Sequence, residues 1–443
     1  MRLQVLAILS SLFLSPYLSF AQTEFQRTYG GMKDDDAYHV IGTPDKGLLT
    51  IGSTLSFGTG KSDIFMVRLD SVGNMEWSKT YGGLENDYGR YIDNTNDGNY
   101  IITGYTSSFD KDFKQIFLMK IDPKGEMLWT KTYGLDRSDY ATSVKLCKDG
   151  GFIILGETIN NIGHEKNSDI LVIKTDLAGT VEWSKIYGGE KTDYGYSIEM
   201  TKEGGYIIGG ETNSYGAGEW DFYAININAV GDVIWSKTYG DTQTDFGRFA
   251  CVSPDGGFLI AGNSYSFNSA DLDVCLIKVN NEGDPEWAKS YSGANTDYLL
   301  SMIALKDKGY AFTGYSNSFD LSAEDAFLFF VNKDGKVVWG KSYGGKFDDH
   351  GVSLSTVADD GLVIAGRTNS FGTNGGDLYI SKTTQKWTRN MCNSSFLRPM
   401  VSNIKVKTGK GSYSFELHAN ETKVSFSSKT PVCAEQILCL PVY

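Results

Sequence analysis

The chain has 443 residues and a formal net charge of −13, with 51 glycines, 26 tyrosines and 24 phenylalanines against only 8 prolines. An acidic chain of this kind is a poor partner for nucleic acid and for anionic membrane surfaces. Abundant glycine and aromatic residues are typical of many short strands joined by tight turns.

Residues 1–21 resemble a secretory signal peptide. Arg2 supplies the basic start, residues 6–14 form an apolar run, and Ser19-Phe20-Ala21 ends the segment with a small-residue cleavage pattern. The apolar run is too short to span a bilayer, and no other stretch is typical of a transmembrane segment. We therefore expect a protein that is secreted or displayed at the cell surface.

From residue 25 onward one sequence motif recurs. Its fullest form is Trp-Ser-Lys-Thr-Tyr-Gly-Gly at 77–83. Its Trp returns every 52 or 54 residues, and Phe25 begins a first copy 52 residues before Trp77. An Asp stands ten residues after each of these seven anchor positions. A period near 50 residues is typical of propeller blades, which bury their faces against each other. The predicted structural anchors are Trp77, Trp129, Trp183, Trp235, Trp287, Trp339, Asp35, Asp87, Asp139, Asp193, Asp245, Asp297 and Asp349.

The second unit shows the strands expected in each repeat. They cover residues 88–95, 100–106, 116–121 and 127–133, separated by turns and one polar loop. The second and third strands are apolar on both faces, which predicts burial between neighbouring blades. Repeated seven times over residues 22–386, this pattern predicts an all-β, seven-bladed propeller of four-stranded blades.

The two ends of the repeat region complement each other. The seventh unit has only three strands, whereas Phe25–Tyr29 is a fourth strand with no strands before it. We expect this N-terminal strand to complete the seventh blade beside Leu378–Thr383, because closing the ring removes exposed sheet edges.

Residues 387–443 differ in composition from the repeats. Short apolar runs at 404–407, 413–417 and 424–426 predict three strands, in a small C-terminal β appendage or a tail laid on the propeller. Cys392, Cys433 and Cys439 could supply one disulfide in an oxidising compartment, but the sequence does not give the pairing. The repeat cysteines Cys147, Cys251 and Cys275 are expected to be small buried hydrophobes.

Each unit carries two aspartates on one face of the predicted ring, the face with the longer loops. One is the anchor Asp, and the other precedes the third strand in six of the seven units. They predict a repeated acidic rim that could bind Ca²⁺ or cationic groups. The alternative, that each Asp caps backbone N–H groups of its own turn, explains seven copies better.

Candidate contact residues lie where the units differ. The loop at 160–168 is two residues longer than its counterparts and contains His164 and Glu165, and the next such loop carries Trp220. An exposed Trp beside a polar loop could stack on a sugar or a side chain. Loop drift with a packed Trp is the simpler interpretation.

The fragment Asp-x-x-Gly-x-x-x-Trp, at Asp70/Gly73/Trp77 for instance, resembles the tryptophan-docking repeat of quinoprotein-like propellers. The fuller phrase is more similar to the propeller repeats of secreted and cell-surface bacterial proteins. Quinone-dependent dehydrogenases of the docking class usually have eight blades and often an adjacent Cys pair, whereas this chain has seven units and no such pair.

No phosphate-binding loop, His-x-x-x-His motif or nucleophile elbow is present, and the four histidines are scattered. We therefore predict no catalytic residues and no cofactor. The expected function is a non-enzymatic, exported module that binds protein or glycan through its loop-rich acidic face. The alternative is a propeller enzyme, either a quinone-dependent dehydrogenase or a polysaccharide lyase, that uses the central channel.

Overall fold

The computed structural model describes residues 24–383, except 111, 135–136, 161–166, 267–270, 307, 319–322 and 374, together with the backbone of seven short strands between 394 and 439. The expected signal peptide, His164 and Glu165 lie outside the described residues. The described part contains strands and turns, and no helix in it has the length and apolarity that a membrane crossing needs.

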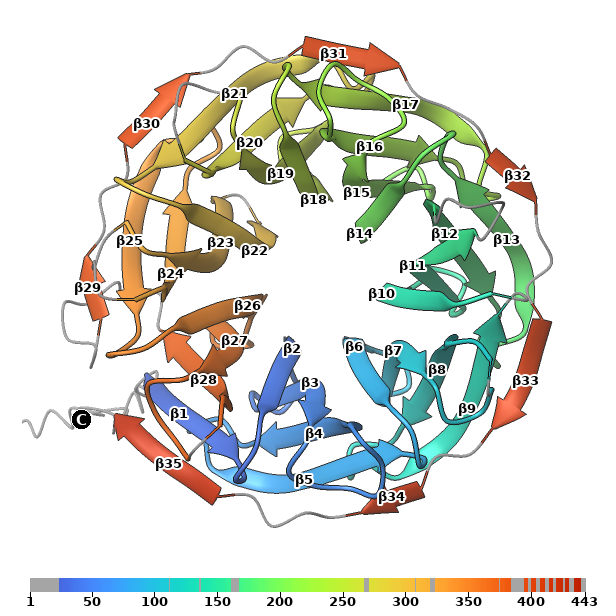
Figure 1. The fold of residues 1–443 in the computed structure, drawn as a ribbon, viewed down its shortest axis with the longest axis vertical. Helices are drawn as coiled ribbons and strands as arrows, with labels where there is room; N and C mark the ends of the chain where they lie inside the picture. Colours follow the sequence, from blue (N-terminus) through green and yellow to red (C-terminus); the bar gives the residue numbers. More distant parts are fainter. Residues whose placement is uncertain are drawn as a thin grey trace, which may run out of the picture.

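Seven antiparallel sheets surround a central channel, which confirms the predicted seven-bladed propeller (Figure 1). The innermost strand of each blade faces the channel. These strands are β2 (Asp35–Gly42), β6 (Asp87–Asn94), β10 (Asp139–Leu146), β14 (Asp193–Met200), β18 (Asp245–Val252), β22 (Asp297–Leu305) and β26 (Asp349–Thr356).

The second and third strands of each blade form the buried middle of the wall, because their apolar residues pack on both neighbouring blades. The second strands are β3 (Leu48–Thr54), β7 (Tyr100–Thr106), β11 (Phe152–Asn160), β15 (Tyr206–Thr212), β19 (Phe258–Ser264), β23 (Gly309–Ser316) and β27 (Leu362–Thr368). The third strands are β4 (Asp63–Leu69), β8 (Gln115–Ile121), β12 (Asn167–Thr175), β16 (Asp221–Ile227), β20 (Asp273–Val279), β24 (Asp325–Val331) and β28 (Asp377–Thr383).

The fourth strands carry the repeated Trp and Tyr. They are β5 (Met75–Gly82), β9 (Met127–Gly134), β13 (Val181–Tyr187), β17 (Val233–Gly240), β21 (Pro285–Ser292), β25 (Val337–Tyr343) and β1 (Phe25–Gly30). β1 pairs antiparallel with β28, with Phe25 opposite Lys382 and Tyr29 opposite Leu378. The predicted closure of the seventh blade by the N-terminal strand is therefore confirmed.

Of the two arrangements that the sequence left open, the structure has the tail laid on the propeller and not a separate three-stranded appendage. The tail forms seven short strands, each of which adds a fifth strand to one blade (Figure 1). They are β29 (Ser394–Phe396), β30 (Met400–Asn403), β31 (Lys407–Lys410), β32 (Ser414–Glu416), β33 (Asn420–Val424), β34 (Ser427–Lys429) and β35 (Ala434–Cys439). Only the expected strand at 413–417 coincides with an observed one, because the pairing is set by the spacing of the blade edges and not by local apolar runs.

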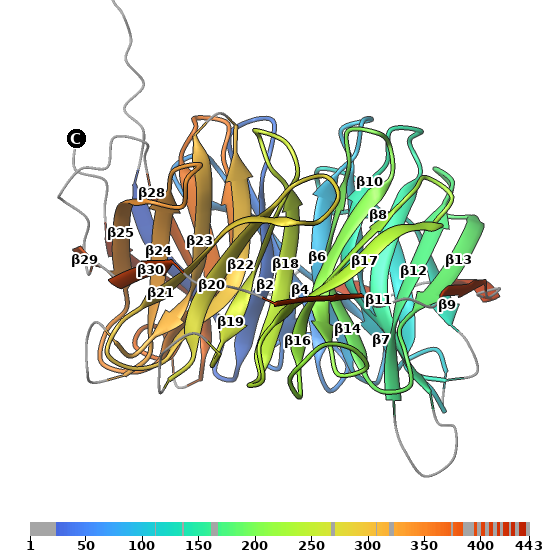
Figure 2. The same cartoon turned by 90° about the horizontal axis from the view of Figure 1, so that it is seen from above.

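The tail strands pair in turn with blades 6, 5, 4, 3, 2, 1 and 7, so this belt runs around the ring against the order of the blades. They lie near mid-height on the outer wall (Figure 2). Their starts are six or seven residues apart, about 20–23 Å of extended chain.

A repeated contact is found at six of the seven junctions between neighbouring blades. The Tyr four residues after the anchor donates a hydrogen bond to the glycine carbonyl of the turn between the third and fourth strands of the next blade, and this glycine has a positive φ. The bonds, of 2.6–2.8 Å, are Tyr29–Gly73, Tyr81–Gly125, Tyr133–Gly179, Tyr187–Gly231, Tyr239–Gly283 and Tyr291–Gly335.

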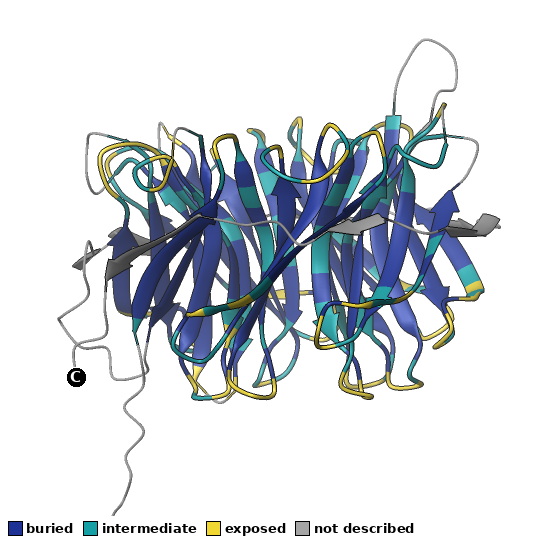
Figure 3. Cartoon of the chain, turned by 90° about the horizontal axis from the view of Figure 1, so that it is seen from below, coloured by how far each residue is buried: buried dark blue, intermediate teal, exposed yellow. Residues whose placement is uncertain are grey.

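Phe25 and five of the anchor tryptophans lie over the same glycines. A Cβ placed on Gly179, for example, would come within 3.0 Å of the Trp129 ring. Trp339 is buried and the other five are half-buried, with the Trp77 and Trp235 indoles donating to backbone carbonyls of the next blade. Exposed residues are concentrated in the loops at the two rims, while the wall between them is buried (Figure 3).

Candidate functional site at the central channel

Every innermost strand contains a β-bulge at the same position. The register with the second strand shifts around the residue 13 positions after the anchor, which therefore has no partner in the ladder. A bulge re-aims one side chain, and here it directs that side chain into the channel. The seven bulge residues are Tyr38, Arg90, Thr142, Tyr196, Arg248, Leu300 and Val352.

All seven bulge residues line one cavity of about 690 Å³ in the channel. This volume lies in the usual range for ligand sites. Blades 1 to 5 contribute polar or aromatic bulge residues, whereas blades 6 and 7 contribute Leu300 and Val352, with Ile303 beside them. The cavity therefore has a polar, aromatic wall and an apolar wall.

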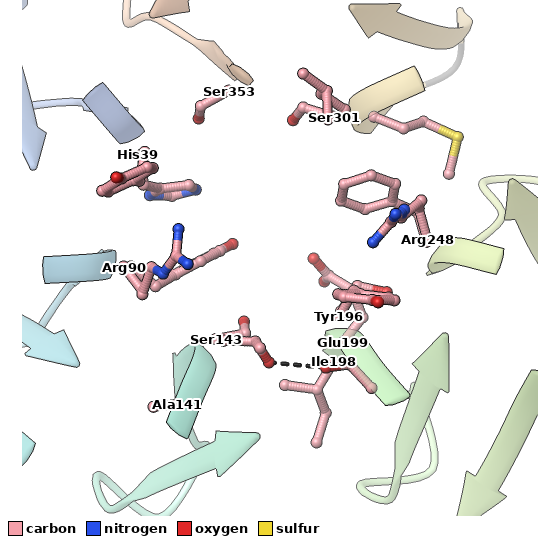
Figure 4. A pocket seen from close by; sticks show the side chains of 18 of the residues that line it. His39, Arg90, Ala141, Ser143, Tyr196, Ile198, Glu199, Arg248, Ser301 and Ser353 are labelled. Carbon is pink, nitrogen blue, oxygen red and sulfur yellow. Dashed lines mark hydrogen bonds between the residues drawn. The ribbon is translucent and has the colours of Figure 1, made fainter. Parts of the chain in front are cut away.

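Two arginine–tyrosine pairs occupy the polar wall, three blades apart. The guanidinium of Arg90 lies 4.4 Å from the ring centroid of Tyr38, and that of Arg248 lies 4.2 Å from Tyr196. Arg248 Nη2 donates to Tyr298 Oη at 2.5 Å, but its buried Nε has no acceptor. Arg90 forms no ion pair with the described residues and lies over two tyrosine rings. Both guanidiniums point toward the channel centre from opposite sides (Figure 4).

Two glutamates near the ends of second strands face these arginines. Burial raises the pKa of Glu157 to about 7, although Arg90 and Lys114 oppose the shift. Glu211 accepts a hydrogen bond from Tyr196 Oη at 2.8 Å through Oε1, while its buried Oε2 has no partner. Burial also raises the pKa of Glu211. The polar wall thus holds several buried groups whose hydrogen-bonding capacity the protein does not use.

Deeper in the cavity, His39 stacks on Tyr91 with ring centroids 3.6 Å apart. Burial and the nearby Lys145 lower the pKa of His39 to about 3, so its imidazole is neutral at pH 7. Lys145 Nζ and Glu199 Oε1 form an ion pair at 3.0 Å.

Half-buried aromatic rings continue from the cavity to the loop-rich rim. Tyr105 lies 5.0 Å from Tyr88 and 4.9 Å from Tyr140, centroid to centroid. Trp220 stacks on Tyr194 at 5.7 Å with an interplanar angle of 5°. The structure thus places Trp220 beside a residue of the cavity, with one face covered by Tyr194.

The anchor aspartates do not form an exposed rim: all seven are buried. Asp87 is typical, because Oδ2 accepts hydrogen bonds from Gly83 N at 2.7 Å and from Ser108 Oγ at 2.7 Å. Thr106 Oγ1 donates to its other oxygen. The anchor aspartates therefore cap the loops of their own blades. The expectation of an acidic rim built from them is wrong, because their carboxylates are buried and bond to groups of these loops.

The second set of aspartates packs against the first. Gly82 separates Asp63 from Asp87, and a Cβ there would come within 1.9 Å of Asp63 Oδ1 and 2.9 Å of Asp87 Oδ2. At the corresponding place, burial together with the nearby Asp245 raises the pKa of Asp221 to about 6. In the described residues, no three His, Cys, Asp or Glu side chains come together as a metal site would need.

The sequence analysis did not identify the bulge residues as candidate site residues. It placed the candidates in loops that differ in length between units. A signal was present: the residue ten positions after each anchor is always Asp, whereas the one at 13 is Tyr, Arg, Thr, Tyr, Arg, Leu and Val in turn. A position that varies at a fixed place in a repeat marks a surface that differs from blade to blade. The predicted burial of Cys147, Cys251 and Cys275 is confirmed, and each is a free thiol.

No protein-family model matches the chain, and no curated protein matches it in sequence. Solved propellers do resemble it. Sqt1 of Chaetomium thermophilum, bound to the N-terminus of ribosomal protein L10, has 11% identity and a TM-score of 0.47 over 80% of this chain and 98% of its own. Acylaminoacyl peptidase of Pyrococcus horikoshii has 11% identity and a TM-score of 0.45 over 83% of this chain and 53% of its own. At this identity the likeness concerns the fold alone.

Proposed function

We propose that the protein is an exported binding module whose partner, a protein or a glycan, contacts the loop-rich rim and the channel mouth. One observation carries the proposal: the cavity joins half-buried aromatic rings to Arg90, Arg248 and Glu157, and the buried Nε of Arg248 has no acceptor. Aromatic surface with a few convergent polar groups is the usual composition of a recognition site.

The loops of the same rim support a macromolecular partner. Met32, Leu84 and Phe347 are 77%, 78% and 52% exposed, in the loops that enter blades 1, 2 and 7. Exposed apolar side chains at the edge of a polar cavity are typical of protein interaction surfaces. The exposed charged residues in the loops of this rim are of both signs. The acids include Glu85, Glu190, Glu219 and Asp348, and the lysines include Lys33, Lys61, Lys191 and Lys346.

Binding of the chain without residues 1–21 to peptide and glycan arrays tests the proposal. We expect Tyr140→Ala and Trp220→Ala each to weaken a specific signal about tenfold, since stacked aromatics contribute about 0.5–1.5 kcal/mol beyond their buried area. Val230→Ala is the control, because Val230 is 57% exposed in a turn on the opposite rim. A specific signal unchanged in both aromatic variants would contradict binding at this rim.

Export is tested separately, by the N-terminal sequence of the protein recovered from outside the cytoplasm. We expect it to begin at Gln22, after the small-residue pattern at 19–21. If the chain is recovered only in the cytoplasm, with Met1 or Arg2 as its first residue, the proposed export is wrong.

A propeller enzyme is the second candidate, and Glu157 is the observation that favours it. A carboxyl group with a pKa of about 7 beside Arg90 suits a general acid or base acting on an anionic substrate. Polysaccharide lyase activity would release unsaturated sugar ends, and Glu157→Gln would abolish it. Quinone-dependent dehydrogenase activity would reduce a dye when quinone and alcohol are supplied. We favour binding because His39 is stacked under Tyr91 and has a pKa of about 3.

A further inference from the structure

We infer that the central cavity receives the carboxyl terminus of a protein partner whose last residue is apolar. This inference rests on the proposed binding function, and it chooses one partner class and one chemical group within it. The argument uses the two guanidiniums, the apolar wall and the position of the cavity beneath the rim.

The guanidiniums supply the charge that a carboxylate needs. Arg90 has five N–H donors and forms no ion pair with the described residues. It lies over the faces of Tyr38 and Tyr105, and Glu157 is close enough to interact with its charge. Arg248 Nε is buried without an acceptor. Guanidinium–carboxylate hydrogen bonds are among the strongest in proteins, since both partners are ionised and the fork geometry matches.

The ion pairs of the cavity leave these donors available. Lys145 is paired with Glu199, whereas neither Arg90 nor Arg248 has a carboxylate oxygen within ion-pair distance among the described residues. Glu211 is nonetheless close enough to influence the charge of Arg248. The anion is therefore expected to depend chiefly on Arg90, with Arg248 as the second donor.

The apolar wall of the cavity determines which kind of side chain the carboxylate-bearing residue of the partner can have. Going around the ring from Arg248, the next two bulge residues are Leu300 and Val352, followed by Tyr38 beneath Arg90. An anion held between the arginines would place its neighbouring substituent against Leu300 and Val352. Burying an aliphatic side chain against Leu300 and Val352 is favourable, and the only side-chain hydroxyls that blades 6 and 7 add to the described lining are those of Ser301 and Ser353.

The depth of the site explains why a chain end fits. The bulge residues lie three positions into strands that begin at the loop-rich rim, so the cavity opens toward that rim. A terminal residue can enter the cavity while the preceding residues pass the aromatic rings and reach the exposed Met32, Leu84 and Phe347. A volume of about 690 Å³ holds a few residues and not a folded domain.

The test uses the chain without residues 1–21 and two matched probes, acetyl-Ala-Ala-Leu as the free acid and as the amide. Binding is measured by saturation-transfer NMR and by titration. We expect the acid to bind at least tenfold more tightly than the amide. The double variant Arg90→Gln/Arg248→Gln should lose this preference, and Val352→Glu should lose it independently through repulsion. Lys61→Gln is the control, because Lys61 pairs with the exposed Glu85.

Equal binding of acid and amide, retention of the preference in the double arginine variant, or binding of neither peptide would overturn the inference. Stronger binding of glucuronic acid than of the acid peptide would also overturn it and would assign the cavity to an acidic glycan. Array binding that needs Tyr140 but persists without the arginines would reject the inference and leave the proposed function standing. Loss of array binding in Val230→Ala alone would reject the proposed function instead.

Discussion

At the scale of single residues, the propeller depends on glycines that have two different tasks. Gly150 and Gly179 both have positive φ, at 86° and 76°. A Cβ on Gly150 would meet nothing within 4 Å, whereas one on Gly179 would lie 2.9 Å from Tyr133 Oη and 3.0 Å from Trp129. The first glycine allows a turn, and the second also allows the next blade to dock.

Substituting these two glycines separates the two tasks. Gly150→Ala should cost about 1–2 kcal/mol of unfolding free energy, the price of a left-handed conformation at a non-glycine residue. Gly179→Ala should cost about 1–2 kcal/mol more, because it also displaces the buried Tyr133 hydroxyl from the Gly179 carbonyl. Urea denaturation measures both. Equal losses would show that the docking contact adds nothing to the turn.

The raised pKa of Glu157 gives a prediction for stability against pH. Its pKa rises from 4.5 to about 7 on folding, so the folded protein holds a proton between these values that the unfolded chain releases. The free energy of unfolding therefore falls as pH rises from about 4.5 to 7. Arg90 and Lys114 are the charged groups facing Glu157, and both limit this fall.

Glu157→Gln should remove this pH dependence. The variant should match the parent near pH 4.5 and exceed it at pH 8, by on the order of 1–3 kcal/mol. Urea midpoints at pH 5 and pH 8 measure the difference, with the exposed Glu203→Gln as the control. A variant that is less stable than the parent at pH 8 would mean that the Glu157 carboxylate pairs with Arg90 favourably.

At the scale of elements, prediction from the sequence succeeded where apolar pattern and turn chemistry agree. The range 100–106 was predicted as the structure has it in β7, whose apolar run is bounded by a turn and a polar loop. Prediction from the sequence failed in the tail. The positions of β29 to β35 depend on pairing with the free edges of strands that lie far away in the sequence. Channel-facing bulges were also missed, since strand pairing alone creates them.

The tail belt should protect the outer edges of the blades. In a chain that ends at Thr383, the backbone groups of β9 that pair with β33 would face solvent. We expect faster amide hydrogen exchange in the fourth strands, with no change in β7 and β11, and concentration-dependent association through the open edges. The ring itself should persist, because β1 and β28 close it without the tail. If amide hydrogen exchange in the fourth strands is unchanged in the shortened chain, the tail belt does not protect these strands.

At the scale of the whole molecule, ring closure couples the two ends of the repeat region. β1 lies between β28 and β35, so the seventh sheet combines segments from the start, the end of the repeats and the tail. Side chains reinforce this junction: Arg367 Nη2 lies 3.0 Å from Asp34, and Gly376 N donates to the same carboxylate at 2.9 Å. The closure was predictable because one unit lacked the strand that another possessed.

A disulfide across the junction would measure how much closure contributes. Gln26 and Ser381 are opposite each other in β1 and β28, and Ile225 and Ser236 occupy the same places within blade 4. Cysteine pairs at these sites would close loops spanning 381 − 26 = 355 and 236 − 225 = 11 residues. Loop-closure entropy predicts that oxidation stabilises the junction pair by about 3 kcal/mol more than the blade 4 pair. Denaturation of each variant, oxidised and reduced, gives the two gains, and equal gains would mean that the ends remain associated in the unfolded chain.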